Sequence, residues 1–162
     1  GEGFADRLAD EGFEDVRAVV RIARRRLRHG AICACVYDSR EVAHVEWLAL
    51  NEGVRRKVFP TPPLVCYGGG EAAWGGAHTV SRYRNKGAFR YGMACALQYC
   101  RERGYRVLVG ATAIGNMPSM QGQTPYSPRV RVCLRCRCRL FRRRWTEIPC
   151  ESQALWPPEE ES

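Results

Sequence analysis

The stretch His78-Thr-Val-Ser-Arg-Tyr-Arg-Asn-Lys-Gly-Ala-Phe-Arg-Tyr-Gly92 decides which fold this chain can adopt. It places the end of a strand, a basic turn and the start of a helix in immediate succession. The first amides of a helix lack intrahelical partners and carry a partial positive charge, and Gly87 lets the backbone approach a ligand closely. Arg84 and Lys86 add charge at the rim. The stretch therefore predicts an anion site that fits a pyrophosphate, with a generic helix cap as the alternative.

The elements around this turn follow from hydrophobic periodicity. Helices are predicted over 12–29 and 88–103, where apolar residues recur at helical spacing. Strands are predicted over 31–38, 41–50, from 71 or 74 to 79, from 105, and over 130–141, with a turn at 38–40 and a loop over 51–63. The strand from Tyr105 is apolar enough to be buried on both faces. This order predicts an α/β fold with a mixed sheet, in a single domain over 1–150 followed by a flexible acidic tail over 151–162.

Two motifs in register resemble the GNAT superfamily of N-acetyltransferases. Tyr83-Arg84-Asn85-Lys86-Gly87-Ala88 resembles the family's pyrophosphate loop, Gln/Arg-x-x-Gly-x-Gly/Ala, in which Arg84 and Gly87 match and Phe89 stands at the last glycine or alanine. Gly-Asn-Met-Pro-Ser-Met, residues 115–120, follows at the distance that the family leads one to expect, and Asn116 and Ser119 match its Asn-x-x-Ser/Ala pattern. The resemblance covers residues 72–121.

The resemblance implies a mostly antiparallel sheet flanked by helices and splayed at an acyl-CoA site, where free backbone amides pair with the pantetheine arm. It implies transfer of an acetyl group from acetyl-CoA to an amine, with acetyl-CoA as co-substrate and no metal. The implied cofactor-binding residues are His78, Thr79, Arg84, Asn85, Lys86, Gly87, Ala88, Phe89, Asn116 and Ser119. Main-chain amides near Thr79 would polarise the thioester carbonyl.

The family's general acid is a tyrosine about seven residues after the asparagine. Gln123 stands at that place, and Tyr126 is the nearest tyrosine, so Tyr126 is the candidate acid. Pro125 beside it predicts that the helix is cut short.

Amine attack on a thioester requires a neutral amine, and therefore a base. Glu46 is the candidate, because His44 lies two residues earlier on the same face of its strand and the two could share one site. Glu71 is the alternative base, and a solvent-facing Glu46 is the structural alternative.

Net charge indicates an anionic ligand or partner. The formal charge is +9, and almost all of it comes from arginine, since Lys57 and Lys86 are the only lysines. This favours an acceptor amine that carries a carboxylate or phosphate, or an acidic peptide. Two other classes stay open: a non-catalytic acyl-CoA-binding domain, and an arginine-rich nucleic-acid-binding domain based on the arginine face of 129–144. The chain could be a monomer or a homodimer.

Nine cysteines could indicate a disulfide framework. Their number is odd, however, and the chain is long enough to form a core without disulfides. We expect reduced thiols in the cytoplasm, with a buried packing role for Cys33, Cys35, Cys66, Cys95 and Cys100. A zinc site at Cys133, Cys136 and Cys138, with Cys150 downstream, is disfavoured, because strand alternation puts Cys133 on the opposite face from Cys136 and Cys138. The first residues lack the pattern of a secretory signal, and no stretch is apolar enough for a membrane span.

Overall fold

The computed structural model describes residues 16–59, 64–139 and 142–149. The chain divides into two compact units, Gly1–Gly110 and Ala111–Ser162. A single domain over 1–150 therefore stays a prediction. The predicted flexible tail and the first residues of the predicted helix over 12–29 lie outside the described residues.

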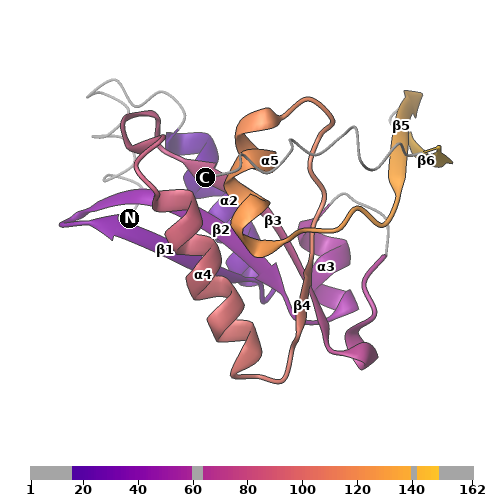
Figure 1. Ribbon diagram of the computed structural model, residues 1–162, viewed down its shortest axis with the longest axis horizontal. Coiled ribbons are helices and arrows are strands. Elements are labelled where there is room, and N and C mark those ends of the chain that lie inside the picture. The colour runs from indigo at the N-terminus through magenta and orange to yellow at the C-terminus, as the bar shows by residue number, and fades with distance from the viewer. Residues whose placement is uncertain (1–15, 60–63, 140–141, 150–162) are drawn as a thin grey trace. The chain divides into compact units, whose positions relative to one another are not determined.

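The first unit holds a four-stranded sheet in the order β1-β2-β3-β4 (Figure 1). Strands β1 (Ile32–Asp38) and β2 (Glu41–Ala49) form the predicted hairpin, with Ser39 at a left-handed φ of 56° in the turn. Strand β3 (Glu71–Thr79) pairs antiparallel with β2, and β4 (Val107–Val109) pairs parallel with β3. The predicted α/β fold with a mixed sheet flanked by helices is confirmed.

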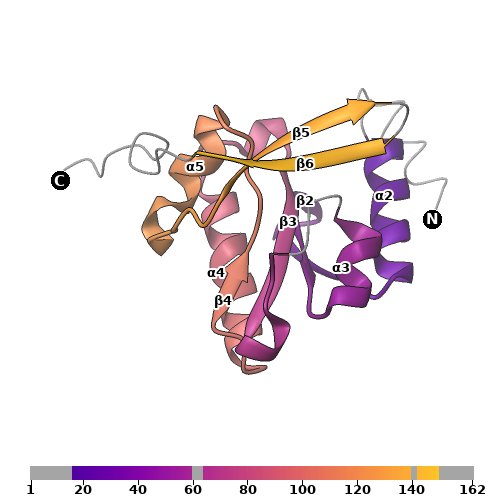
Figure 2. The ribbon, with the colours of Figure 1, turned by 90° about the vertical axis from the view of Figure 1, so that its right-hand side faces the viewer.

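Helices cover both faces of this sheet. Helix α4 (Ala88–Arg101) connects β3 to β4 and packs on one face, whereas α2 (Val16–Arg28) and α3 (Glu52–Val58) lie on the other (Figure 2). Parallel strands need such a crossover, because a tight turn cannot reverse the chain twice. Alternate residues of β2 therefore face different helices, which separates the hydrophobic core from the buried polar residues His44 and Glu46.

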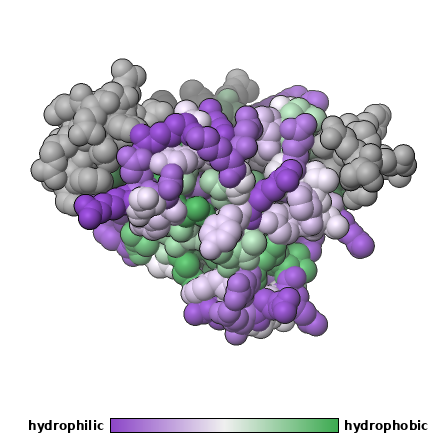
Figure 3. Space-filling view, turned by 60° about the vertical axis from the view of Figure 1, so that its left-hand side comes forward, coloured by the Kyte–Doolittle hydropathy of each residue, from purple (hydrophilic) through white to green (hydrophobic). Residues whose placement is uncertain are grey.

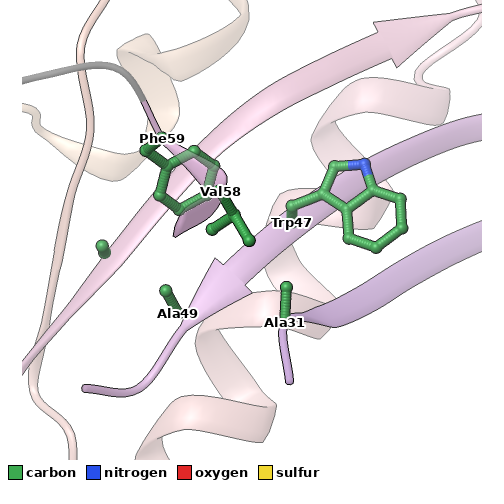
Figure 4. Close-up of a cluster of buried hydrophobic side chains, with 6 residues drawn as sticks. Ala31, Trp47, Ala49, Val58 and Phe59 are labelled. Carbon is green, nitrogen blue, oxygen red and sulfur yellow. The ribbon is translucent and has the colours of Figure 1, made fainter. Parts of the chain in front are cut away.

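The main core lies between the sheet and α3 (Figure 4). Trp47 and Ala49, two apart on β2, contact Val58 and Phe59 at the end of α3. Its buried members are Ala31, Trp47, Ala49, Val58, Phe59 and Ala73. Removing these side chains from water is the main stabilisation of this face.

The predicted loop over 51–63 is wrong for 52–58, where α3 forms. Asn51 caps this helix by accepting a hydrogen bond from the Val54 amide at 2.9 Å. Glu52 accepts hydrogen bonds from Arg55 and Arg56, each at 2.7 Å. The charges that indicated a loop are thus helix pairs at spacings of three and four.

The strand predicted from Tyr105 is also wrong in extent and burial. Strand β4 has only 3 residues, its Val107 is 41% exposed, and Leu108 and Val109 are half-buried. β4 is an edge strand of the sheet, so it has a neighbour on one side only. An apolar run alone could not distinguish this position from a central one.

The second unit contains α5 (Met117–Gln123), a short 3-10 helix η3 (Thr124–Tyr126), and an antiparallel pair, β5 (Cys133–Arg139) and β6 (Arg142–Ile148). The shortened helix is confirmed, because α5 ends before Pro125. The strand predicted over 130–141 begins later, at Cys133, and β6 was not predicted.

Most cysteine predictions are wrong. Cys100 is buried and Cys33 half-buried, but Cys35, Cys66 and Cys95 are exposed. Cys95 lies on the outer side of α4, although its sequence neighbours are apolar. Cys133 is 6% exposed and forms a disulfide, so the thiols are not all reduced.

The surface mixes polar and apolar residues, as Figure 3 shows for one face. Exposed large hydrophobic side chains include Ile22, Leu27, Tyr91 and Ile114. Among the helices in the described ranges, none has the length and apolar character to cross a membrane.

Candidate functional site

The turn between β3 and α4 is an exposed loop with two left-handed residues. β3 ends at Thr79, as predicted, and a short 3-10 helix, η2 (Ser81–Tyr83), leads into residues 84–87. Asn85 has φ 60° and Gly87 has φ 80°. Asparagine and glycine are the residues that tolerate this conformation best. An ideal Cβ built on Gly87 has nothing within 4 Å, so the space beside the loop is open.

The amino end of α4 has no side-chain cap. Gly87 occupies the cap position and the first turn contains no acidic residue. The first intrahelical bond joins the Tyr91 amide to the Gly87 carbonyl at 2.9 Å, so the amides of Ala88 and Phe89 have no helical carbonyl to bind. The helix dipole adds a partial positive charge at this end.

The loop that precedes these amides carries two basic side chains. Arg84 and Lys86 are exposed, and the Arg84 Nε donates to the Thr79 carbonyl at 3.3 Å, which ties the loop to the end of β3. The Tyr83 hydroxyl donates to Glu41 at 2.8 Å, and the Lys86 Nζ lies 5.8 Å from the centre of the Tyr83 ring. These contacts hold the loop against the end of β3 and the start of β2.

Beneath the loop, a buried histidine and a buried glutamate lie together on β2. His44 and Glu46 are both 0% exposed, and the His44 Nε2 lies 3.8 Å from the Glu46 Oε2. The His44 Nδ1 is hydrogen-bonded to the Thr79 hydroxyl at 2.8 Å, and Glu46 Oε2 accepts from the Trp74 Nε1 at 2.7 Å. His44 and Glu46 thus lie side by side, as predicted, and the solvent-facing alternative for Glu46 is wrong.

This pair keeps two polar atoms without a partner. Within the described part of the chain, the His44 Nε2 and the Glu46 Oε1 form no hydrogen bond, although both are buried. Such atoms are rare in native interiors and mark places where water or a ligand binds.

Helix α4 closes over the pair. The Phe89 ring packs edge-on against the His44 ring, with centroids 5.5 Å apart, and against Trp74 at 6.2 Å. Gly92 brings the helix backbone close, because an ideal Cβ there would lie 2.7 Å from the His44 Cδ2. The Phe89 ring therefore packs over the buried pair.

Strands β3 and β4 separate early. Their pairing is limited to Glu71–Val107, Ala72–Leu108 and Ala73–Val109, so Trp74–Thr79 of β3 is not paired with β4. The separation begins where Gly110 passes the Trp74 indole, since an ideal Cβ on Gly110 would lie 2.3 Å from the ring. The edge of β3 beside the loop is thus not covered by its neighbour strand.

Other predicted residues have structural contacts. Glu71, the alternative base, accepts a hydrogen bond from the Cys66 amide at 2.8 Å beside the short 3-10 helix η1 (Tyr67–Gly69). His78 is exposed near the end of β3. Among the described residues, Cys133, Cys136 and Cys138 belong to no group of three side chains that could hold a metal ion.

The remaining candidates lie in the second unit. Asn116 caps α5, accepting from the Ser119 amide at 3.4 Å. The Ser119 hydroxyl is hydrogen-bonded to the Gln123 side chain at 3.1 Å. Tyr126 ends η3 and is half-buried. All three residues thus lie along one short segment.

Trp74 and Gly92 were not predicted as site residues. Gly92 carries a usable signal, because glycine inside a helix costs about 1 kcal/mol relative to alanine and needs a compensating reason. Trp74 carries none, since a tryptophan in an apolar strand is ordinary core.

Comparisons with family models, curated proteins and solved structures give no match for this chain. The fold and the site define the protein only as an α/β protein with a mixed four-stranded sheet, carrying a basic, glycine-capped helix start beside an uncovered strand edge.

Proposed function

We propose that this protein is an N-acyltransferase that transfers an acetyl or other acyl group from acyl-CoA to an amine. The observation that carries the proposal is the early separation of β3 from β4 beside the uncapped start of α4. The uncovered edge of β3 can pair with an amide-containing arm as an added strand would. The helix start can bind the negatively charged group at the end of that arm.

The residues of the loop suit a pyrophosphate. The free amides of Ala88 and Phe89 would donate to the phosphate oxygens, with Arg84 and Lys86 supplying charge. Asn85 and Gly87 give the loop its left-handed turn, and His78 and Thr79 end the strand that would flank the arm. By resemblance, Asn116 and Ser119 would line the same ligand.

In the proposed reaction a neutral amine attacks the thioester carbonyl carbon, and the bond from carbon to sulfur breaks. The main-chain amide near Thr79 would polarise the carbonyl oxygen. Glu46 would take the proton that the amine loses, and Tyr126 would supply a proton to the leaving thiolate. No covalent enzyme intermediate is required.

The first experiment is calorimetric titration with acetyl-CoA. Wild-type protein is expected to bind in the micromolar range. Gly87→Glu, which places a negative side chain beside the phosphates, is expected to abolish binding. Gly87→Asn is the matched control, because asparagine tolerates the left-handed φ of 80° without adding charge. It should retain most of the affinity. Lys57→Gln on α3 lowers the net charge by one, as Gly87→Glu does, and controls for that change. Absence of binding to the wild type would refute the proposal.

The first alternative is a non-catalytic acyl-CoA-binding domain. It is favoured by the complete burial of Glu46 under α4. Both functions predict acyl-CoA binding, so only turnover separates them. Release of free CoA in the presence of any amine would exclude the alternative.

The second alternative is an arginine-rich nucleic-acid-binding domain. Arg135, Arg137 and Arg144 share one face of the β5–β6 pair and are exposed, and a two-stranded ribbon fits the major groove of DNA. Binding to DNA or RNA that falls steeply with salt and is indifferent to CoA would favour this function.

A further inference from the structure

The edge strand β1 carries two cysteines whose sulfur atoms are already in contact. Cys33 and Cys35 lie two residues apart on the same face of β1, and their Sγ atoms are 3.3 Å apart. Cys35 is exposed and Cys33 half-buried. The outer thiol is therefore accessible, and the inner one lies directly behind it.

The surroundings stabilise a thiolate on Cys35. The hydrogen bond from Cys33 lowers the pKa of the Cys35 thiol to about 7; partial burial opposes this shift, and a hydrogen bond from Tyr37 adds to it. The hydrogen bond to Cys35 raises the pKa of Cys33 far above its usual value, with burial adding to the effect and the Arg26 guanidinium opposing it. One thiolate and one thiol thus share the pair.

Arg26 is held beside Cys33 by the core. Its guanidinium lies over the Trp47 ring at 5.2 Å and over the Phe59 ring at 5.9 Å from the ring centres. Glu46, from the neighbouring strand, acts on Cys33 in the opposite sense to Arg26. The positive charge of Arg26 attracts anionic reagents. A disulfide of two tripeptides with free carboxylates is such a reagent.

The strand can accommodate a disulfide between these positions. Two residues of an extended strand span about 6.4–6.8 Å, at the upper end of the Cα separations found in disulfides. β1 is an edge strand of the sheet, and its pairing with β2 shifts register between Val36 and Tyr37, directly after Cys35. An edge strand with a neighbouring irregularity can shorten without breaking pairs on two sides.

We propose that Cys33 and Cys35 form a redox-active dithiol that exchanges with small-molecule disulfides of the glutathione type. The Cys35 thiolate attacks one sulfur of the small disulfide, whose S–S bond breaks and releases one thiolate. Cys33 then loses its proton, and its sulfur attacks the Cys35 sulfur of the mixed disulfide, releasing the second thiolate. Two protein thiols are oxidised to one disulfide, and one small disulfide is reduced to two thiols.

A bond near the limit of its geometry is easily reduced, so the reaction is reversible. The disulfide exchange is independent of acyl transfer. Of the residues assigned to acyl transfer, only Glu46 lies near the dithiol, and it takes no part in the exchange.

The test is incubation of the purified protein with oxidised glutathione, followed by tryptic mass spectrometry. The tryptic peptide 29–40 contains Cys33 and Cys35 and no other cysteine. In the wild type this peptide is expected to lose two hydrogen atoms, to carry no glutathione, and to regain the hydrogens with excess reduced glutathione. Cys33→Ser should leave glutathione bound at Cys35, whereas Cys35→Ser should leave Cys33 unmodified.

The chain supplies its own control. Cys136 and Cys138 are also two apart on a strand and both are exposed, yet their sulfur atoms are not in contact in the part of β5 that the structure describes. They are expected to become separately modified by glutathione. A disulfide that forms equally fast between Cys136 and Cys138 would overturn the proposal, because spacing alone would then account for it. Persistent glutathione on both Cys33 and Cys35, or no reaction at either, would overturn it as well.

The rate gives a second readout. A thiol with a pKa of about 7 is half ionised at that pH, but its thiolate is a weaker nucleophile than one of ordinary pKa. The two effects together predict that Cys35 reacts about threefold faster at pH 7 than an unperturbed exposed thiol. Its rate should rise with pH and level off above about 7. A rate that continues to rise up to pH values near 9 would contradict the assigned thiolate.

Discussion

Gly92 is a position at which a larger side chain would collide with buried neighbours. An ideal Cβ would lie 2.7 Å from the His44 Cδ2 and 3.4 Å from the Glu46 Oε1, and both side chains are fully buried. Alanine in a helix normally stabilises by about 1 kcal/mol relative to glycine, but overpacking costs about 1–3 kcal/mol. We therefore expect Gly92→Ala to lower the free energy of unfolding by about 1 kcal/mol, measured by urea denaturation.

His44→Ala provides the partner for a double-mutant cycle. Removing the imidazole leaves room for the added methyl group, so the double variant should lose less stability than the sum of the two single variants. Additive losses, or a stabilised Gly92→Ala, would show that the helix does not pack on His44 as described.

Glu46→Gln tests the proposed base while preserving the shape of the site. The amide oxygen can still accept the hydrogen bond that the Trp74 Nε1 donates at 2.7 Å, so the fold should survive. Loss of a general base typically costs about 100-fold or more in rate. We expect a reduction of at least that size in steady-state CoA release, with acetyl-CoA affinity unchanged.

Glu71→Gln is the matched comparison, because Glu71 is the alternative base and its carboxylate accepts a hydrogen bond from the Cys66 amide, away from His44 and Glu46. An unaffected Glu46→Gln enzyme would remove Glu46 from the reaction and leave the binding proposal standing.

At the residue scale the sequence predicts the pair but not its burial. Period-two alternation correctly places His44 and Glu46 on one face of β2. It cannot show that α4 covers that face, because this depends on Gly92, Phe89 and a crossover of the whole helix. The predicted burial of Cys35 is wrong for the same reason: the residue lies in an apolar run, and only its position on an edge strand exposes it.

At the scale of elements, α3 depends on charge pairing. Glu52 binds Arg55 and Arg56, and these hydrogen bonds lower the pKa of its carboxyl from 4.5 to about 2. Its side chain is 32% exposed, so solvent screening reduces the stabilisation to about 1 kcal/mol. Glu52→Gln should lower the free energy of unfolding by about that amount at pH 7.

The pH dependence of this effect has a defined sign. A carboxyl whose pKa is lower in the folded state stabilises the fold above its unfolded value, and the contribution is lost as pH falls toward the folded value. The difference between wild type and Glu52→Gln should therefore be constant above pH 5.5 or so and shrink between about 4.5 and about 2. A difference that is independent of pH throughout would exclude the ion pair as its source.

Helices and strands were predictable where their own sequence pattern determines them, and were missed where they depend on a cap or on a partner strand. The hairpin β1–β2 and helix α4 are encoded by their own periodicity and were predicted with small errors. α3 was missed because its 7 residues have little amphipathic pattern and depend on the Asn51 cap and the Glu52 pairs. β6 was missed because its sequence is rich in arginine and becomes a strand by pairing with β5.

At the scale of the whole molecule, the first unit contains its own sheet and core. All four strands of the large sheet and every member of the main buried cluster precede Ala111. We expect a fragment of residues 1–110 to fold by itself, with the near-ultraviolet circular dichroism of the buried Trp47 and Trp74 and one cooperative urea transition.

The fragment also separates the two parts of the proposed function. It contains the loop 84–89 but lacks Asn116, Ser119 and Tyr126, so it should bind acetyl-CoA more weakly than the full chain and fail to turn over. An unfolded fragment would show that the second unit is needed for the stability of the first.

The close approach of Gly92 to His44 also constrains how this protein can evolve. A side chain at position 92 and an imidazole at position 44 compete for the same volume between α4 and β2, so the two together are destabilising. A lineage that replaces His44 with a small residue can tolerate a larger residue at 92, whereas one that keeps His44 is selected to keep glycine. The two positions, 48 residues apart in sequence, should therefore covary among natural homologues: a residue larger than glycine at 92 should occur together with a residue smaller than histidine at 44.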